Sequence, residues 1–294
     1  ADSYRDAISM HRDIIARSPK HLLTTTIDYW RAWIGKRPFS FYGLDTEVVD
    51  LFKKSLLIIR AHFDHHGGII ASSDSDIIQY GRDTYAYVWP RDAAYAALSL
   101  DKAGYDDISE RFFSFCADAL TDDGYLLHKY RPDGSLGSSW HPWIRNGTPQ
   151  LPIQEDETAI VLFCLWEHYE ISKNLEFIES MYNPLVKASA DFLVRHRDTK
   201  TGLPLPSYDL WEERWGISCY PTAATIGGLE AAARFATLLG KNDAAKEYAK
   251  VAASMRSALE THFYDPTEGY FIKLLEVVDG ALVPDRTVDA ASAY

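Results

Sequence analysis

The fold is decided by the stretch over residues 85–120, YAYVWPRDAAYAALSLDKAGYDDISERFFSFCADAL. An aromatic, charged segment leads into a helical pattern over 91–103, which is followed by a short link at Gly104-Tyr105 and a second helical pattern over 106–121. Pro90 is typical of a first helical turn, and Gly104 is typical of a helix break. The stretch therefore predicts a helical hairpin that is entered through a long loop and turned through a short one.

The same arrangement recurs along the chain at a regular interval. Helices preceded by long loops begin near residues 90, 155 and 221, at steps of 65 and 66 residues. Together with an earlier helix, the hairpins give seven candidate helices, over 45–65, 91–103, 106–121, 155–172, 174–197, 221–240 and 242–264. Stacked hairpins of this kind form a solenoid or close into a toroid, with the long loops on one face. The alternative is an irregular helical bundle whose spacing is accidental.

Shorter segments between the helices carry other patterns. Three β-like runs predict short hairpins, partly because RPDG and DG turns follow two of them, over 69–72, 125–130 and 269–278. Asn183-Pro184 either breaks the helix over 174–197 or delays its start. His65-His66, followed by two glycines, is predicted to end the helix over 45–65, and a metal site at this pair is the less favoured alternative.

The first forty residues differ from the rest of the chain. They hold one plausible helix, then Trp30 and Trp33, then basic residues and Pro38. We predict a linker or arm over residues 1–40 and a helical domain over residues 41–294. The apolar face of the arm is expected to need a partner surface.

The composition is that of an acidic globular protein. The 294 residues carry a net charge of −12, with 47% hydrophobic residues. This balance argues against nucleic acid or an anionic membrane as a partner, and no apolar run reaches the roughly 18 residues of a membrane span. Cys116, Cys164 and Cys219 are odd in number and far apart, so we expect neither a disulfide framework nor a zinc site. Unpaired thiols and a start without a visible signal peptide favour the cytoplasm, with secretion as the alternative if an export signal was lost.

Aromatic residues make up 13% of the chain, and many lie beside charged residues in the long loops. In the first such loop, Tyr85 and Trp89 precede Arg91 and Asp92. Flat aromatic faces pack against the C–H side of a pyranose, while an arginine and an aspartate hold its hydroxyl groups. Although Asp92 also suits an ordinary helix start, the cluster predicts a sugar-binding site.

The two later loops carry similar clusters. Trp140 and Trp143, an exposed-looking pair, precede the acidic run that opens the helix at 155. The loop over 204–215, PLPSYDLWEERW, is the strongest candidate for catalysis, because three carboxylates and three aromatic rings lie in it without a helical period. A carboxyl group beside tryptophan can stay protonated near neutral pH, since desolvation disfavours the charged form, and can then protonate a leaving group. The alternative is a solvated acidic pair at Glu212-Glu213.

Motifs for other chemistries do not occur in the sequence. There is no glycine-rich phosphate loop, no GxSxG elbow and no HExxH motif. Asp74-Ser75-Asp76 lacks the spacing of an EF-hand and is predicted to be a solvated turn. Asn146-Gly147-Thr148 is a formal glycosylation sequon, which matters only in a glycosylating host. We expect no cofactor and no metal.

Four motifs in one order make a family recognisable. They are YVWPRDA at 87–93, SSWHPW at 138–143, PIQEDETA at 152–159 and YDLWEER at 208–214. From about residue 45 to its end, the chain resembles the catalytic domain of prokaryotic glucoamylases of glycoside hydrolase family fifteen. The resemblance implies an all-α fold, an (α/α)6 toroid with short β-hairpins in its loops and the active site where the loops gather. Residues 1–40 resemble the linker that follows an N-terminal β-sandwich in such enzymes.

The resemblance also implies an activity and a set of residue roles. Such an enzyme removes glucose from the non-reducing ends of α-glucans or malto- and isomalto-oligosaccharides, cleaving α-1,4 or α-1,6 bonds with inversion and releasing β-D-glucose. Glu212 matches the general acid, Glu213 a substrate-binding carboxylate beyond the scissile bond, and Arg91 with Asp92 the pair that grips the terminal glucose. Pocket-lining aromatic positions are matched by Tyr85, Trp89, Tyr208 and Trp211. Residues expected in the pocket wall or directly behind it are Trp140, Trp143, Gln154 and Asp156.

One departure from the family pattern concerns the general base. An inverting mechanism needs a second carboxylate roughly 6.5–9.5 Å from the acid, and the family's base lies in the last part of the domain. No segment of this chain matches it, and seven candidate helices compare with the twelve of a closed toroid. We therefore expect a fragment that lacks normal catalysis by itself, with a C-terminal part of the domain and an N-terminal β-sandwich as its missing partners.

Other functions stay open from the sequence. A trehalase or dextran glucosidase of the same family would differ in the pocket beyond the first sugar. A non-catalytic glucan-binding protein would keep the fold; the missing base favours it for this chain, and the intact DLWEER motif opposes it for the parent. An unrelated helical-repeat interaction protein would have a groove without the aromatic and carboxylate clusters.

Overall fold

The computed structural model describes residues 3–73, 85–278 and 280–293, and the chain divides into two compact units, Ala1–Ala61 and His62–Tyr294. The first unit consists of α1 (Tyr4–Ile15), α2 (Pro19–Ile34) and α3 (Thr46–Ala61). Ser3 and Ser18 cap the first two helices through their side-chain oxygens. The first forty residues thus hold two helices where one was predicted. The domain boundary predicted after residue 40 stays a prediction.

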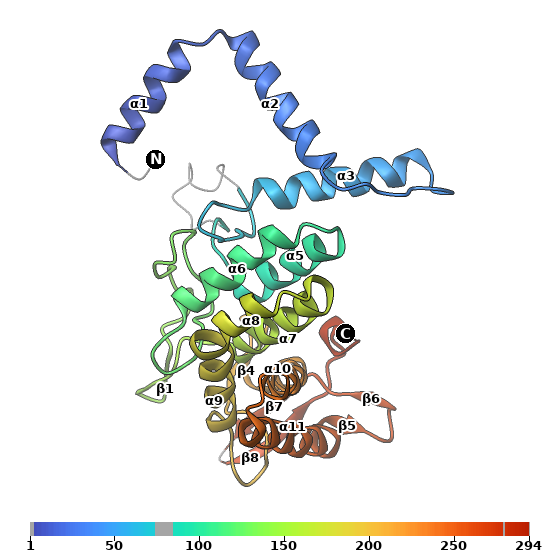
Figure 1. Ribbon diagram of the computed structural model, residues 1–294. Coiled ribbons are helices and arrows are strands. Elements are labelled where there is room, and N and C mark those ends of the chain that lie inside the picture. The colour runs from blue at the N-terminus through green and yellow to red at the C-terminus, as the bar shows by residue number, and fades with distance from the viewer. Residues whose placement is uncertain (1–2, 74–84, 279, 294) are drawn as a thin grey trace. The chain divides into compact units, whose positions relative to one another are not determined.

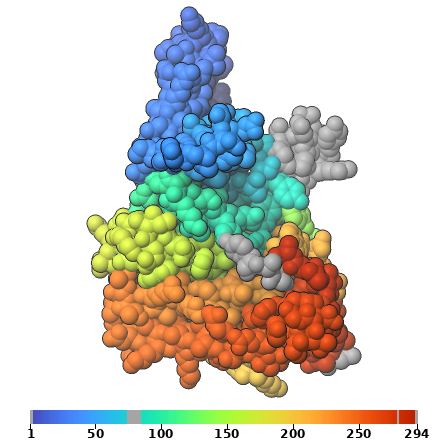
Figure 2. Space-filling model, turned by 90° about the vertical axis from the view of Figure 1, so that its right-hand side faces the viewer, coloured from blue at the N-terminus to red at the C-terminus, as the bar shows by residue number. Residues whose placement is uncertain are grey.

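The second unit is a stack of three helical hairpins, as Figure 1 shows. The first helix of each hairpin is α5 (Pro90–Lys102), α7 (Glu155–Ser172) or α10 (Cys219–Leu238), and α7 packs against both of the others. The second helix is α6 (Asp106–Ala119), the broken helix α8 (Leu175–Met181) to α9 (Ala188–Arg195), or α11 (Asn242–Phe263). Figure 2 shows the three hairpins as successive green, yellow and orange bands. The predicted all-α arrangement of stacked hairpins is confirmed.

The first and second helices of the hairpins differ in how they are buried. In α7 and α10, buried side chains occur on nearly all sides, whereas α6 and α11 bury one face. Helices α7 and α10 approach closely at Gly228, where a Cβ atom would lie 2.7 Å from the carbonyl oxygen of Ala159. Helices α5 and α7 are joined by a fully buried contact of 3.0 Å between Asp101 Oδ1 and His168 Nδ1. These contacts fix the spacing of the helices whose first turns reach the long loops.

One predicted helix is interrupted. The segment over 174–197 forms α8, a π-helical turn η1 (Tyr182–Lys187) and α9. Pro184 lies in the π-helical turn, and proline supplies no N–H for an α-helical hydrogen bond. The wider π-helical turn accommodates the missing hydrogen bond at Pro184, so the helix continues beyond it.

A small sheet that the sequence only partly predicted stands beside the helices. Its four antiparallel strands run in the order β3 (Ser207–Tyr208), β4 (Trp215–Ser218), β7 (Leu274–Val278) and β8 (Ala281–Asp285). Gly216 allows the close contact between β4 and β7, since a Cβ atom there would lie 2.6 Å from the carbonyl oxygen of Leu275. Because residues 209–214 join β3 to β4, the sheet presents the DLWEER motif at the tip of a hairpin.

The other predicted β-like runs are less regular. The run over 69–72 gives a single bridge between Ile69 and Phe63, and the run over 125–130 gives bridges from Tyr130 to Val88 and Leu136. Two small hairpins complete the unit, with strands β1 (Ile144–Arg145), β2 (Thr148–Pro149), β5 (Tyr264–Asp265) and β6 (Tyr270–Phe271). A 3-10 turn, η2 (Ala290–Ala293), follows the sheet.

Several smaller predictions can be compared with the structure. The helix predicted over 45–65 ends at Ala61, so the prediction that His65-His66 forms its last turn is wrong. Cys116, Cys164 and Cys219 are buried and free. The turn predicted at Asp74-Ser75-Asp76 lies outside the described residues. In the part of the chain that is described, no helix has both the length and the apolar character of a membrane span.

Two adjacent glycines of α10 give a prediction for stability. Gly228→Ala should destabilise the fold by about 1–3 kcal/mol, because the added Cβ atom meets the backbone of α7. Gly227→Ala is the matched control, because its Cβ atom would meet only Phe163 at an ordinary 3.5 Å, and alanine favours a helix by roughly 0.5–1 kcal/mol. Urea unfolding of both variants measures the difference, and equal midpoints would contradict the tight contact.

Candidate active site

The candidate site is a pocket of about 270 Å³ where the long loops meet. Its walls come from the segment before α5, the first turn of α5, the loop after α6, and the tip of the β3–β4 hairpin. The lining residues are Ala71, Tyr85, Trp89, Arg91, Asp92, Trp140, Leu210, Trp211 and Glu212. Seven of the residues singled out in the sequence therefore line one pocket.

One wall of the pocket is aromatic. The ring of Trp89 lies 5.8 Å from the rings of both Tyr85 and Trp140, measured between centroids. Behind them, the ammonium group of the buried Lys129 lies 3.5 Å from the Trp140 centroid and 5.2 Å from the Trp89 centroid. Since a cation is attracted to the face of an aromatic ring, Lys129 stabilises the positions of both indoles. Lys129 was not singled out in the sequence, because a lysine in a polar run is usually solvated.

Arg91 joins α5 to the start of α7 and to the β3–β4 loop. Its Nη1 atom lies 2.6 Å from Asp156 Oδ2 and 3.2 Å from Glu157 Oε1, both at the start of α7. Its Nη2 atom lies 3.6 Å from Asp92 Oδ2 and donates a hydrogen bond of 3.5 Å to the carbonyl oxygen of Leu210. A guanidinium with several donors in a rigid plane can bridge such partners. Arg91 is thus fixed in place, while the Asp92 side chain is 57% exposed and faces solvent-accessible space.

The charges around Arg91 are strongly coupled. Burial by itself lowers the pKa of Arg91, but Glu157 and Asp156 outweigh that effect and raise it well above its usual range. Burial raises the pKa of Glu157 well above its usual range, although Arg91 opposes this rise. The arrangement therefore keeps Arg91 charged. Glu157 was missed in the sequence, because acidic residues in a first helical turn are ordinarily explained by the helix dipole.

Glu212 is held in an unusual backbone conformation at the tip of the β3–β4 hairpin. Its φ angle is +56°, in the left-handed region that costs a non-glycine residue free energy. Its Oε1 atom accepts a hydrogen bond of 3.1 Å from Trp89 Nε1, and its carbonyl oxygen lies 2.7 Å from His141 Nε2. Within the described part of the chain, its Oε2 atom has no hydrogen-bond partner. The carboxyl group of Glu212 is therefore oriented through one oxygen only.

Asp209 organises the loop that holds Glu212. Its carboxylate accepts hydrogen bonds of 2.9 Å from the backbone N–H of Glu213 and 3.2 Å from that of Arg214. Its carbonyl oxygen accepts hydrogen bonds from Glu212 N, at 2.9 Å, and from Gln154 Nε2. With 1% of its surface exposed, Asp209 is a buried support of the tip. In the sequence, Asp209 is visible only as an aspartate three residues before Glu212. Its contacts with the hairpin tip are visible only in the structure.

Lys273 connects this loop to the end of the sheet. Its Nζ atom lies 3.2 Å from Asp209 Oδ2 and 2.9 Å from Asp289 Oδ2. Asp289 Oδ2 also accepts a hydrogen bond of 2.8 Å from Trp211 Nε1. Burial alone lowers the pKa of Lys273, but the two aspartates outweigh this effect and raise it. Lys273 therefore supports both the loop that carries Glu212 and the indole of Trp211, which also lines the pocket.

The remaining predicted site residues lie outside the pocket lining. Asp156 and Gln154 are fully buried behind it, in contact with Arg91 and Asp209 respectively. Tyr208 stacks on His141 with ring centroids 3.9 Å apart, so it supports the histidine that contacts Glu212. Trp143 is 8% exposed, which corrects the expectation of an exposed tryptophan pair; Trp140 is 41% exposed. Glu213 is exposed and does not line the pocket.

Glu155, the first residue of α7, is a further buried carboxyl group that sequence reasoning passed over. It is 1% exposed, and burial raises its pKa to about 8, although the nearby Ser207 side chain opposes the rise. Near neutral pH, Glu155 is therefore mainly protonated in the folded chain. The start of α7 thus combines three buried acidic residues with the guanidinium of Arg91.

The chemistry that this arrangement permits follows from its parts. Exposed indole and phenol faces can pack against a sugar ring, and Asp92 can accept hydrogen bonds from hydroxyl groups. Glu212 has one oxygen fixed by Trp89, and its other oxygen is left without a partner among the described residues. The site is suited to binding a sugar and protonating a leaving oxygen.

The bridge made by Lys273 gives a prediction. Lys273→Met should destabilise the chain by about 3 kcal/mol, because it leaves the buried carboxylate of Asp209 without its cation. Lys246→Met, at an exposed position of α11, should change stability little. Denaturant unfolding measures both, and tryptophan fluorescence of the folded variants should shift only for Lys273→Met, since Trp211 loses its anchored acceptor. Indistinguishable variants would show that the bridge has no stabilising effect.

The raised pKa of Glu155 predicts a pH dependence of stability. Its carboxyl group ionises at about pH 4.5 when unfolded and about pH 8 when folded, so the folded chain binds the proton more tightly. Stability should therefore fall as the pH rises through this window, by at most about 1.4 kcal/mol per pH unit from this group. Glu155→Gln should remove this loss. The free energy of unfolding of the variant should therefore rise relative to that of the wild type between about pH 5 and about pH 8. Unfolding at several pH values tests this against the exposed control Glu247→Gln, which should follow the wild-type profile.

Comparison with known proteins identifies the family. The family model described as glycosyl hydrolases family 15 matches residues 50–293. An uncharacterized glycosyl hydrolase of Methanocaldococcus jannaschii is 28% identical over 282 residues, which are 95% of this chain and 41% of that protein. Trehalase 2 of Sulfolobus acidocaldarius is 27% identical over 219 residues, which are 67% of this chain and 37% of that protein. The chain thus spans about two fifths of the length of these curated relatives.

Solved structures agree on the fold. A bacterial glucoamylase in complex with acarbose aligns over 98% of this chain and 42% of its own, with a TM-score of 0.72 and 20% identity. Glucoamylase from Saccharomycopsis fibuligera aligns over 81% of this chain and 55% of its own, with a TM-score of 0.58 and 18% identity. The stacked hairpins are thus part of a glucoamylase-like helical toroid, as the motifs implied. Because the family model covers most of its length, the chain belongs to glycosyl hydrolases family 15.

Proposed function

We propose that this chain carries the sugar-binding and acid-donating part of an exo-acting α-glucosidase of glucoamylase type. The observation that carries the proposal is the position of Glu212. It lines an aromatic pocket, is 8% exposed, and has Trp89 N–H fixed on one of its two oxygens. Since Oε1 is already an acceptor, Oε2 is the atom that would carry the proton. A protonated Glu212 would donate that proton to the glycosidic oxygen as the bond breaks.

The pocket wall supports a role in binding the terminal sugar. Trp89, Tyr85 and Trp140 offer ring faces, and Asp92 offers a carboxylate beside the fixed Arg91. The bacterial glucoamylase of similar fold was solved with acarbose, a carbohydrate ligand, in agreement with this role. The assignment of Arg91 and Asp92 to the non-reducing terminal glucose is part of the proposal.

The proposal assigns no general base within this chain. Carboxylates among the described lining residues are Asp92 and Glu212, and Asp92 is assigned to binding. By the family resemblance, the base that activates water on the opposite face belongs to a later part of the domain. Turnover is therefore to be measured on the longest natural form of the protein, and sugar binding on the present chain.

A second candidate substrate has its own support. One relative is Trehalase 2 of Sulfolobus acidocaldarius, so trehalose is the alternative to an α-glucan. Both activities would use the same acid and differ in the contacts beyond the terminal glucose. Glucose release from maltose, isomaltose, dextran and trehalose separates them, and we expect the maltose and isomaltose series to be preferred.

Substitution of Glu212 tests the catalytic role. Glu212→Gln keeps the shape and the Trp89 contact but removes the transferable proton, so kcat on maltose should fall by about a hundredfold or more while glucose binding persists. Glu213→Gln is the control for a neighbouring carboxylate outside the pocket lining, and it should retain far more activity. Unchanged turnover by Glu212→Gln would remove it from the role of acid, whereas binding without turnover by the unaltered long form would favour a non-catalytic glucan-binding protein.

A further inference from the structure

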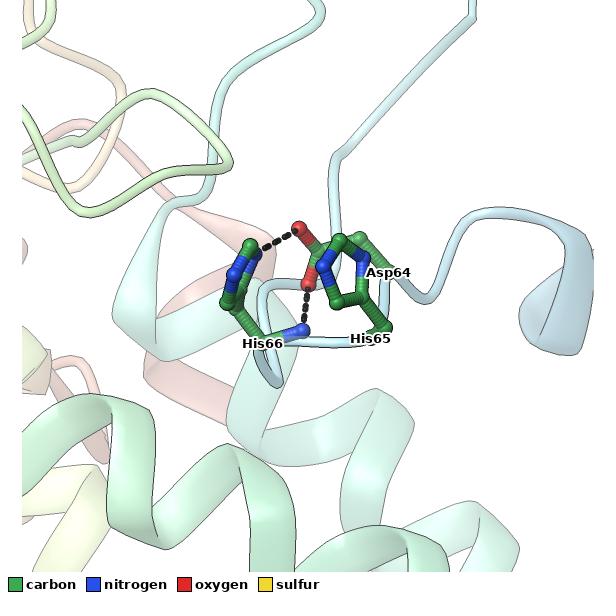
Figure 3. Close-up of side chains that lie close together, drawn as sticks. All are labelled: Asp64, His65 and His66. Atoms are coloured by element: carbon green, nitrogen blue, oxygen red, sulfur yellow. Dashed lines mark hydrogen bonds and ion pairs between the residues drawn. The ribbon is translucent and has the colours of Figure 1, made fainter. Parts of the chain in front are cut away.

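A second cluster of chemically active side chains lies on the turn after residue 62, outside the pocket. Asp64, His65 and His66 each offer one ligand atom, and these atoms all lie within 4.8 Å of one another. Figure 3 shows the three side chains gathered on the same side of the turn, with the Asp64 carboxylate beside the imidazole rings. The two ring centroids are 3.7 Å apart, and Asp64 Oδ2 lies 3.5 Å from His66 Nδ1.

The backbone beneath this cluster is held by contacts of its own. Asp64 N donates a hydrogen bond of 2.9 Å to the carbonyl oxygen of Gly68, and Phe63 forms a bridge with Ile69. Gly67 has a φ angle of +103°, and a Cβ atom there would lie 2.1 Å from the carbonyl oxygen of Arg111. This glycine lets the turn sit directly on α6. The ligand cluster therefore stands on a fixed base, which lowers the conformational cost of binding.

The side chains on this base stay accessible. Phe63, Gly67, Gly68 and Ile69 are buried, whereas His65 and His66 are exposed and Asp64 is half-buried. Asp64 Oδ1 accepts hydrogen bonds of 2.9 Å from His66 N and Gly68 N, so its orientation is set and Oδ2 remains on the side of the histidines. An ion pair between Asp64 and His66 does not account for the position of His65.

We propose that Asp64, His65 and His66 form a binding site for a divalent transition-metal ion, with Zn²⁺ as its representative. Two imidazoles and a carboxylate are ligands that zinc accepts, with water in the fourth position, whereas Ca²⁺ and Mg²⁺ prefer oxygen ligands alone. In a tetrahedral site with bonds of about 2.1 Å, ligand atoms lie about 3.4 Å apart. The ligand atoms of Asp64, His65 and His66 lie within 4.8 Å of one another. Rotation of these side chains can bring the atoms to the tetrahedral distance without moving the turn.

The position of the site suggests what the ion does. Residue 71, which lines the sugar pocket, follows the turn by five residues, and Ala71 N donates a hydrogen bond of 2.9 Å to the carbonyl oxygen of Tyr87. An ion that joins three residues of the turn would restrain the segment that leads to this wall. This effect is independent of the reaction, so the site can be tested without any measurement of activity.

Metal titration of the purified chain tests the proposal. In calorimetry with ZnCl₂, we expect one site per chain, unaffected by excess Mg²⁺ or Ca²⁺, and weakened at least about tenfold in His66→Ala and in His65→Ala. His21→Ala, which removes an exposed histidine of α2, is the matched control and should bind as the wild type does. Zn²⁺ should also raise the melting temperature of the wild type and of the control more than that of the double variant, by linkage.

One further measurement decides between the site and its alternatives. Co²⁺ in place of Zn²⁺ should give visible absorption bands typical of nitrogen and oxygen ligands, and these should disappear in the double variant His65→Ala/His66→Ala. Absence of stoichiometric binding, or equal binding by the double variant and the His21→Ala control, would overturn the proposal. In that case, the Asp64–His66 contact only stabilises the turn. Because both histidines are exposed, the variants should fold, and circular dichroism checks this.

Discussion

The candidate active site depends on the ion pairs and hydrogen bonds made by the buried guanidinium of Arg91. This side chain extends from the first turn of α5 to Asp156 and Glu157 at the start of α7, and to the carbonyl oxygen of Leu210 in the β3–β4 loop. Removing a charged group from water costs free energy unless the group is paired and hydrogen-bonded. The elements that form the pocket must therefore keep the spacing that lets one cation satisfy several partners.

A second layer of contacts transmits this constraint to the proposed acid. Asp209 holds the hairpin tip through backbone N–H groups, Gln154 contacts it from the start of α7, and Lys273 connects it to the sheet. The left-handed conformation of Glu212 is kept by these surroundings and not by its own preference. The same bridge through Asp289 anchors Trp211, so the proposed acid and this indole share one support.

Local pattern was enough to predict most of the fold. The seven helical segments were predicted because apolar periodicity, Pro90 and the glycine links are properties of neighbouring residues. The DG turn after the run over 269–278 predicted the hairpin of β7 and β8. The strands β3 and β4 were missed, because strands of two to four residues have little periodicity of their own and form through pairing, β3 with β4 and β4 with β7. The π-helical turn at Pro184 was likewise not foreseen, since a proline usually signals a helix boundary.

The sequence by itself determined the order of the hairpins, the four motifs that mark the family, and the residue types that could bind a sugar. Only the tertiary structure decided which of those residues share a pocket and which lie behind it. The decisive contacts join residues far apart in the chain: Arg91 and Asp156 are separated by 65 positions, and Trp89 and Glu212 by 123. No local pattern encodes such pairs, because burial and the partner of a polar group depend on how the helices and the sheet pack.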